Sequence, residues 1–90
     1  MEPIELPIED TLDLHTFLPK EVPLLLDDYL AACVEHHIFS VRIIHGKGRG
    51  ILRKRVETIL RNHPLVRTFK TAPSEAGGWG ATLVELLPGQ

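Results

Sequence analysis

The chain has 90 residues, enough for one domain with a single hydrophobic core. Hydrophobic residues make up 43% of it, and no apolar run approaches the roughly 20 residues that a membrane-spanning helix needs. Glu2 and Glu5 lie where a secretory leader would carry Lys or Arg, and the single cysteine, Cys33, can form neither an internal disulfide nor a zinc site alone. Composition therefore predicts a cytoplasmic protein without a membrane span, in which Cys33 is a buried structural thiol.

The net charge of −2 hides an uneven distribution along the chain. Residues 1–35 contain nine acids and one Lys, whereas residues 42–67 contain eight Lys or Arg and one acid. The segment 42–67, called the basic block below, suits a polyanion such as DNA or RNA, because neutralised phosphates release counterions. A solvated helix face is the alternative interpretation of such a run of charge.

The first elements are an arm and a strand. Residues 1–9 contain Pro3 and Pro7 and no clear periodicity, so we expect an extended arm before a single domain over residues 10–88. Polar and apolar side chains alternate over residues 11–15, which predicts a half-buried strand.

Two helices and a second strand follow. Apolar side chains recur every 3.6 residues over 20–37, and Pro19 fits the first turn, so this segment is predicted to be helical. The β-branched run 41–44 predicts a short strand. A second amphipathic helix is predicted over 50–63, and Pro64 ends it.

The last third of the chain predicts a β-hairpin. Strands are expected over 66–71 and 81–87, joined by the loop 72–78 with Pro73 and paired glycines. The order is then β-α-β-α-β-β, an α/β two-layer sandwich. Two helices can cover only one face of four strands, so the other face is expected to be open to a ligand.

The first candidate site is Asp13-Leu14-His15. Alternate residues of a strand share a face, so the carboxylate and the imidazole project together at the strand end where open α/β sheets collect ligands. A carboxylate that fixes the tautomer of a histidine prepares it for general acid or base catalysis. A solvated pair without a function is the alternative.

The second candidate site is the segment His45–Gly50, between the second strand and the second helix. Glycine at every second position lets the backbone approach an anion closely, and the amides of the loop and helix start attract phosphate. Lys47 and Arg49 add full charges. The spacing matches neither a Walker A loop nor a dinucleotide-binding fingerprint, and a flexible turn is the alternative. The predicted contacts of this loop to nucleic acid are Gly46, Lys47, Gly48, Arg49 and Gly50.

If the first two strands are neighbours, His15 and His45 should meet at one edge of the open face. Arg53, in the basic block, is a further predicted contact to nucleic acid. Trp79, between glycines, is predicted to stack on a base, with anchoring of the hairpin in the core as the alternative. The other histidines, His36, His37 and His63, fall at helix ends without the spacing of metal ligands, so no cofactor or metal site is predicted, with a divalent metal ion as the alternative.

Three segments together resemble the Smr (small MutS-related) domain. They are Leu12-Asp13-Leu14-His15, His45-Gly46-Lys47-Gly48-Arg49-Gly50 and Gly77-Gly78-Trp79-Gly80 with the strand that follows, and the likeness covers about residues 8–87. The resemblance implies a four-stranded mixed sheet similar to the C-terminal domain of translation initiation factor three. It also implies binding of DNA or RNA and endonuclease activity that depends on Asp13, His15 and the His45 loop. The family motif usually continues with Gly after the histidine, where this chain has Thr16.

The leading hypothesis from the sequence is a stand-alone Smr endonuclease. His15 and His45 would act as general base and general acid, Asp13 would orient His15, and the loop would hold the scissile phosphate. RNA suits two imidazoles without a cofactor, because the 2′-hydroxyl is an internal nucleophile, whereas DNA hydrolysis is harder without a divalent metal. The alternatives are a non-catalytic nucleic-acid-binding module and a protein-interaction domain that docks on a ribosome or repair factor through its acidic first helix.

Overall fold

The structure, a computed structural model, describes residues 8–88 and contains every predicted helix and strand. The bounds differ from the predicted ones by two residues at most, and the arm predicted for residues 1–9 falls almost entirely outside the described residues. The elements in chain order are β1 (Thr11–Asp13), α1 (Val22–Glu35), β2 (Ser40–Ile44), α2 (Ile51–Arg61), β3 (Val66–Thr71) and β4 (Ala81–Leu86).

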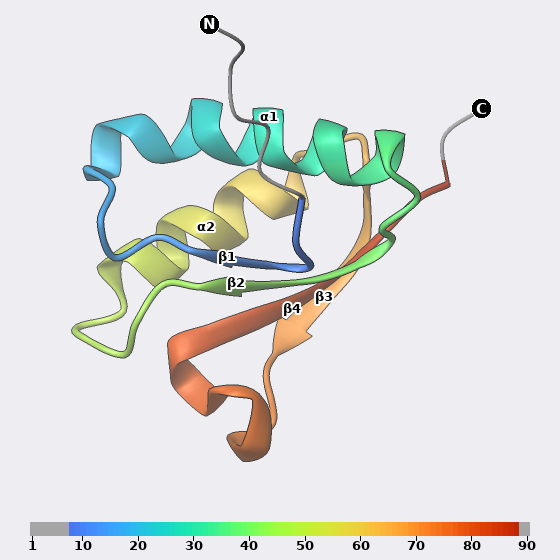
Figure 1. Cartoon of the computed structure of the whole chain (residues 1–90). Helices are drawn as coiled ribbons and strands as arrows, with labels where there is room; N and C mark the ends of the chain where they lie inside the picture. Colours follow the sequence, from blue (N-terminus) through green and yellow to red (C-terminus); the bar gives the residue numbers. More distant parts are fainter. Residues whose placement is uncertain (1–7, 89–90) are drawn as a thin grey trace, which may run out of the picture.

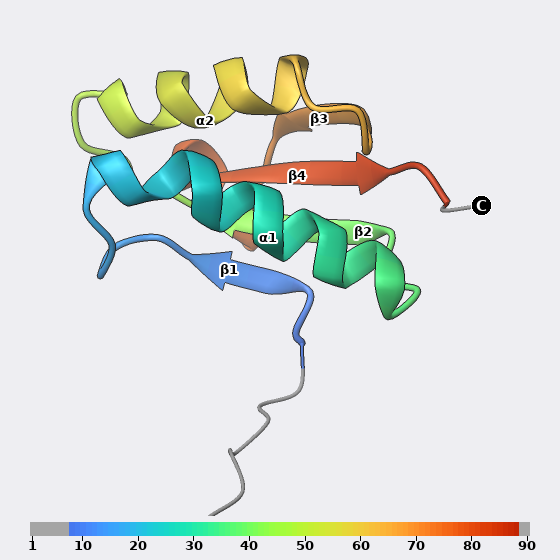
Figure 2. The same cartoon turned by 90° about the horizontal axis from the view of Figure 1, so that it is seen from above.

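The four strands form one mixed sheet in the order β1-β2-β4-β3. β1 runs parallel to β2, whereas β4 is antiparallel to both of its neighbours, β2 and β3. The predicted hairpin of the last two strands and the predicted adjacency of the first two are therefore confirmed. Figure 2 shows β1 and β4 pointing in opposite directions across the sheet.

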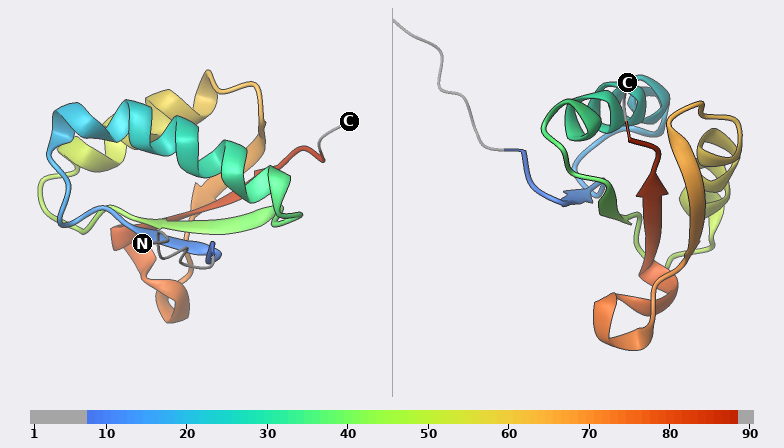
Figure 3. Two further views of the ribbon diagram at one scale, coloured as in Figure 1. Left: turned by 45° about the horizontal axis from the view of Figure 1, so that its top comes forward. Right: turned by 90° about the vertical axis from the view of Figure 1, so that its right-hand side faces the viewer.

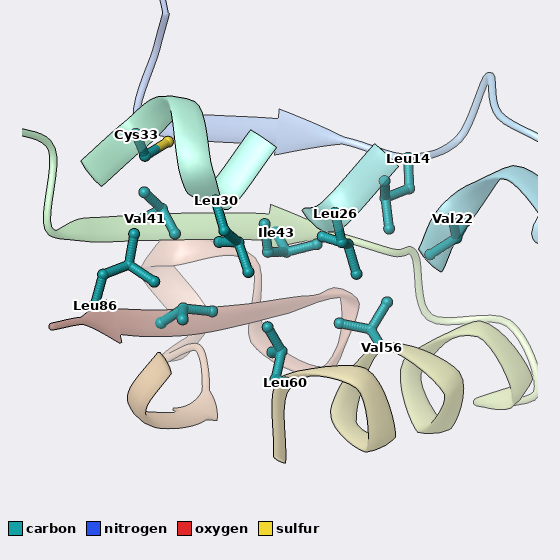
Figure 4. Close-up of a cluster of buried hydrophobic side chains, with 11 residues drawn as sticks. Leu14, Val22, Leu26, Leu30, Cys33, Val41, Ile43, Val56, Leu60 and Leu86 are labelled. Atoms are coloured by element: carbon teal, nitrogen blue, oxygen red, sulfur yellow. The ribbon is translucent and has the colours of Figure 1, made fainter. Parts of the chain in front are cut away.

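Both helices lie on the same face of the sheet, which confirms the two-layer sandwich (Figures 1 and 3). Side chains from both helices, from β2 and β4, and from the segment directly after β1 meet between the layers in one hydrophobic core (Figure 4). The core residues are Leu14, Val22, Leu26, Leu30, Cys33, Val41, Ile43, Val56, Leu60, Val84 and Leu86. The predicted burial of Cys33 is confirmed, and this burial raises the pKa of its thiol.

The ends of α1 explain why the helix is shorter than predicted. A 3-10 turn over Pro19–Glu21 precedes it, and a Glu21 carboxylate oxygen accepts the Leu18 N–H at 2.7 Å. At the other end His37 adopts a left-handed φ of 62°, and the Ile38 N–H reaches back to the Cys33 carbonyl at 2.8 Å. This closing geometry satisfies a free carbonyl of the last turn and turns the chain toward β2.

No helix within residues 8–88 has the length and apolar character needed to cross a bilayer.

Candidate nucleic-acid interface

One edge of the sheet gathers the segments that the sequence singled out. Asp13, the last residue of β1, pairs with Ile44, the last residue of β2, and Ile44 pairs with Ala81, the first residue of β4. The segments after β1, after β2 and before β4 therefore meet at this edge, called the loop edge below. In Figure 2 it is the side toward which the β1 arrow points.

Asp13 and His15 form an exposed, directly bonded pair at the loop edge. His15 Nδ1 lies 2.8 Å from an Asp13 carboxylate oxygen, and the backbone N–H of His15 donates to the same oxygen at 3.0 Å. The His15 side chain is 73% exposed. Since the carboxylate can only accept, Nδ1 carries a proton and Nε2 is the ring nitrogen that remains for a ligand.

The carboxylate of Asp13 is held in its charged form. The hydrogen bond from the His15 backbone N–H, and after it the one from the His15 ring, lower the pKa of Asp13 below its usual value of 3.8. Asp13 is therefore a stable acceptor that fixes the orientation of the imidazole near neutral pH. Thr16 is exposed in the next turn, which the Phe17 N–H closes by donating to the Leu14 carbonyl at 3.0 Å.

The loop between β2 and α2 depends on its glycines. Gly46, Gly48 and Gly50 have φ values of 82°, 33° and 79°, and a side chain at such positive angles is strained. Lys47 and Arg49 between them are exposed. The loop and the first residues of α2 line a small pocket of about 210 Å³, in which two cations and the helix start can face an anion.

His45 differs from its expected position. Strand alternation puts Val41 and Ile43 in the core, and His45 follows on the same helix-covered face, opposite to that of Asp13. The residue is only 6% exposed, and both ring nitrogens have partners. Nδ1 donates to the Gly46 carbonyl at 3.0 Å, and Nε2 lies 2.8 Å from the buried hydroxyl of Thr82. The expectation that His15 and His45 meet on the open face is therefore wrong, although both residues lie at the loop edge.

Two residues that hold the loop were missed in the sequence. Thr82 shares its alternation with Val84 and Leu86, so a polar residue at a core position was the available signal. The Gly80 carbonyl accepts the N–H groups of His45 and Gly46 at 3.0 and 2.9 Å. These bonds fix the turn before β4 against the glycine loop.

Arg53 and Trp79 lie together beside this loop. The Arg53 guanidinium stacks on the Trp79 ring, 4.0 Å from its centroid, and also contacts the Glu57 carboxylate at 3.3 Å and the Thr71 hydroxyl at 3.1 Å. Trp79 is 63% exposed, so the alternative that it anchors the hairpin in the core is wrong. With Lys47 and Lys54, both residues line a pocket of about 430 Å³.

The remaining histidines lie away from the loop edge. His36 and His37 are exposed beyond the end of α1, and His63 donates from Nε2 to the Asp27 carboxylate at 2.9 Å while Nδ1 accepts the Leu65 N–H. Within residues 8–88, no three His, Cys, Asp or Glu side chains are grouped so that they could hold a metal ion.

This geometry defines a class of protein, namely a two-layer α/β domain in which an Asp-x-His segment at a strand end lies beside a glycine-rich cationic loop. The model of the Smr domain family matches residues 12–87, and the chain belongs to that family. The resemblance drawn from the three motifs is thereby confirmed.

Three known proteins illustrate the relationship. The ribosome rescue factor SmrB of Shewanella baltica is 42% identical over 73 residues, which are 81% of this chain and 42% of that protein. The endonuclease MutS2 of Thermomicrobium roseum is 38% identical over 79 residues, 88% of this chain and 10% of that protein. The crystal structure of the Smr domain of Thermus thermophilus MutS2 matches with a TM-score of 0.83 at 34% identity, covering 89% of this chain and all of that one. The chain thus spans less than half the length of these two full-length relatives.

Proposed function

We propose that this Smr domain binds nucleic acid at the loop edge and cuts a phosphodiester bond there. The observation that carries the proposal is the exposed Asp13–His15 pair at the end of β1, directly beside the strand that leads into the loop with Lys47 and Arg49. The names of the two relatives, an endonuclease and a ribosome rescue factor, support it. A ribosome-associated or repair partner is a further part of this proposal.

His15 is the proposed general base. Asp13 holds the proton on Nδ1, so the lone pair of Nε2 can take a proton from an attacking hydroxyl. With RNA, the 2′-hydroxyl gives its proton to Nε2 and attacks the neighbouring phosphorus, a new P–O bond forms and the bond to the 5′-oxygen breaks. The departing 5′-oxygen takes a proton from water, and the products are a 2′,3′-cyclic phosphate and a 5′-hydroxyl end. Lys47, Arg49 and the loop amides offset the charge that develops on the phosphate. RNA is favoured over DNA because this nucleophile is internal, and the reaction is proposed to need no divalent metal.

His45 enters the proposal as a positioning residue. Its ring forms hydrogen bonds with the Thr82 hydroxyl and the Gly46 carbonyl, so it holds the backbone of the phosphate loop against β4. This differs from the role of second acid or base expected from the sequence, because a buried ring with both nitrogens bonded has no free site for a substrate proton.

The test is cleavage of end-labelled RNA and branched DNA in EDTA. His15→Ala should lower the cleavage rate about 10²- to 10⁴-fold, the usual contribution of a general acid or base. His36→Ala, which removes an exposed imidazole beyond the end of α1, is the matched control and should cut at the normal rate. Unchanged turnover in His15→Ala would reject the assignment.

A non-catalytic nucleic-acid-binding module is the second candidate. The burial of His45 favours it, because His15 is then the one exposed imidazole at the loop edge among the described residues. This candidate predicts strongly salt-dependent binding with no product, since the affinity would come from phosphate neutralisation by the basic block. Product formation that tracks His15 would exclude it.

A further inference from the structure

We infer that the exposed face of Trp79 is a stacking site for one unpaired nucleobase, next to the phosphate loop. The inference rests on the proposed binding of nucleic acid and adds a substrate feature: the nucleotide beside the loop must be free of its pairing partner. The main observation behind it is that Arg53 stacks on Trp79, with the Arg53 guanidinium 4.0 Å from the centroid of the indole ring.

Arg53 is tied into the protein rather than free for phosphate. Its side chain is only 19% exposed, and Glu57 one helical turn along α2 offsets its charge at 3.3 Å. Its second contact, to the Thr71 hydroxyl at the end of β3, fixes the guanidinium from the sheet side. Arg53 is therefore held in one orientation by these contacts and covers one face of the Trp79 ring.

The other face of Trp79 is open. A ring that has a guanidinium on one face and is still 63% exposed presents its opposite face to solvent. Trp79 lies outside the hydrophobic core, and a fixed aromatic surface costs little entropy when a flat ligand stacks on it. The cation behind the ring favours an aromatic ligand further, as in single-stranded nucleic-acid sites.

Backbone contacts fix the distance between this surface and the phosphate loop. The Gly80 carbonyl, one residue after Trp79, accepts the N–H groups of His45 and Gly46. Lys47 and Lys54 line the same pocket as Trp79, so cations flank the ring on the loop and helix sides. A nucleotide with its base on Trp79 can thus place its phosphate among these cations.

A base stacked inside a duplex cannot reach this position. The faces of a base inside a duplex are covered by its neighbours, so a base must be unstacked, or lie in a single strand, to reach an aromatic side chain. Stacking tolerates any base, because every base has a π-face. The site therefore selects for strand structure, in DNA and RNA alike, and does not select for sequence.

The experiment uses the sole tryptophan of the chain as its own reporter. Oligothymidylate or oligouridylate of about eight nucleotides, a length typical of single-strand sites, should quench the fluorescence of Trp79. An abasic oligomer of equal length and charge should bind without quenching. RNA is titrated in the His15→Ala background so that cleavage does not consume it. Equal quenching by the abasic oligomer would overturn the inference.

Binding of labelled oligomers by variants is the second measurement. Trp79→Leu should weaken binding of the unpaired oligomers about ten-fold and leave blunt duplex and abasic binding within about two-fold, as expected for one lost stacked base. Trp79→Phe should keep most of the affinity. Leu24→Ala, which trims an apolar residue on α1 that is 69% exposed, is the matched control and should bind normally.

The outcomes separate this inference from the proposed function. If Trp79→Leu binds unpaired oligomers as tightly as the unmodified protein, the stacking site is refuted while the proposed binding stands. If no nucleic acid binds at low salt, both are refuted. Should Trp79→Leu fail to fold, the quenching data on the unmodified chain and the Trp79→Phe affinity still decide.

Discussion

The buried contact between His45 and Thr82 gives a sharp test of how the phosphate loop is held. Thr82→Val keeps the shape of the side chain and removes the hydroxyl that lies 2.8 Å from Nε2 of His45. Thr82 has no exposed surface and His45 only 6%, so water cannot replace the lost partner. An unsatisfied buried nitrogen costs roughly 1–3 kcal/mol. A loss of about 2 kcal/mol lowers Tm by roughly 8–16 °C in a domain of this size.

The measurement is a double-mutant cycle by urea unfolding. Thr82→Val leaves Nε2 of His45 without a partner, and His45→Phe leaves the Thr82 hydroxyl and the Gly46 carbonyl without theirs, whereas the double variant removes both members of the buried Thr82–His45 contact. The double variant should therefore lose less stability than the two single losses together, by about 1 kcal/mol or more. Losses that add within about 0.5 kcal/mol would show that the two side chains do not interact, and the positioning role of His45 would then be rejected.

Three further outcomes can be measured. The pKa of the Asp13 carboxyl, followed by NMR, should lie below 3.8. It should stay below 3.8 in His15→Ala, because the stronger of the two hydrogen bonds comes from the backbone N–H of residue 15. The stabilisation from this charged carboxylate is present above pH 3.8 and is lost as pH falls through the lowered pKa. Gly50→Ala should lower the free energy of unfolding by about 1–2 kcal/mol because of its φ of 79° alone, since a Cβ there meets open space. Gly77→Ala should lower it more, because its Cβ would lie 2.9 Å from the Cβ of Ala81. Urea unfolding compares the two variants. His63→Ala should cost about 1–2 kcal/mol by the same assay, since it removes one bond to Asp27 and one from the Leu65 N–H, and an unchanged midpoint would contradict this.

Periodicity was enough to predict the elements of this fold. The 3.6-residue spacing in the two helices and the alternation in β4 agree with the faces that are buried. β3 does not alternate in burial, because its pairing with β4 shifts register between Val66 and Thr68. The ends of α1 were harder, because the left-handed turn at His37 and the 3-10 turn before Val22 depend on local hydrogen bonds that leave no apolar pattern. The family likeness added the mixed sheet.

The candidate site was only partly predictable. The proximity of Asp13 and His15 was predicted correctly, because Leu12 and Leu14 mark the buried side of this segment, whereas His15 lies in the turn after β1 and not in the strand. For His45, two adjacent isoleucines blurred the alternation of β2, although Val41 before Arg42 was a usable signal for the buried face.

The tertiary contacts of Arg53 could not be predicted from the sequence. Glu57 lies four residues further along α2, so this ion pair had a local signal. The contacts of Arg53 with Thr71 and Trp79 join segments far apart in the sequence. The stacking on Trp79 joins residues from α2 and from the turn before β4, so no local pattern reveals it.

The two bonds accepted by the Gly80 carbonyl have a consequence for how this site can diversify. They join the glycine loop to the hairpin through main-chain atoms alone, so the joint does not depend on which side chains stand at positions 47, 49 and 79. Relatives could exchange those side chains, and with them the preferred ligand, while the scaffold keeps its shape. A ligand that binds this preformed loop would also avoid the conformational entropy cost of ordering a flexible one.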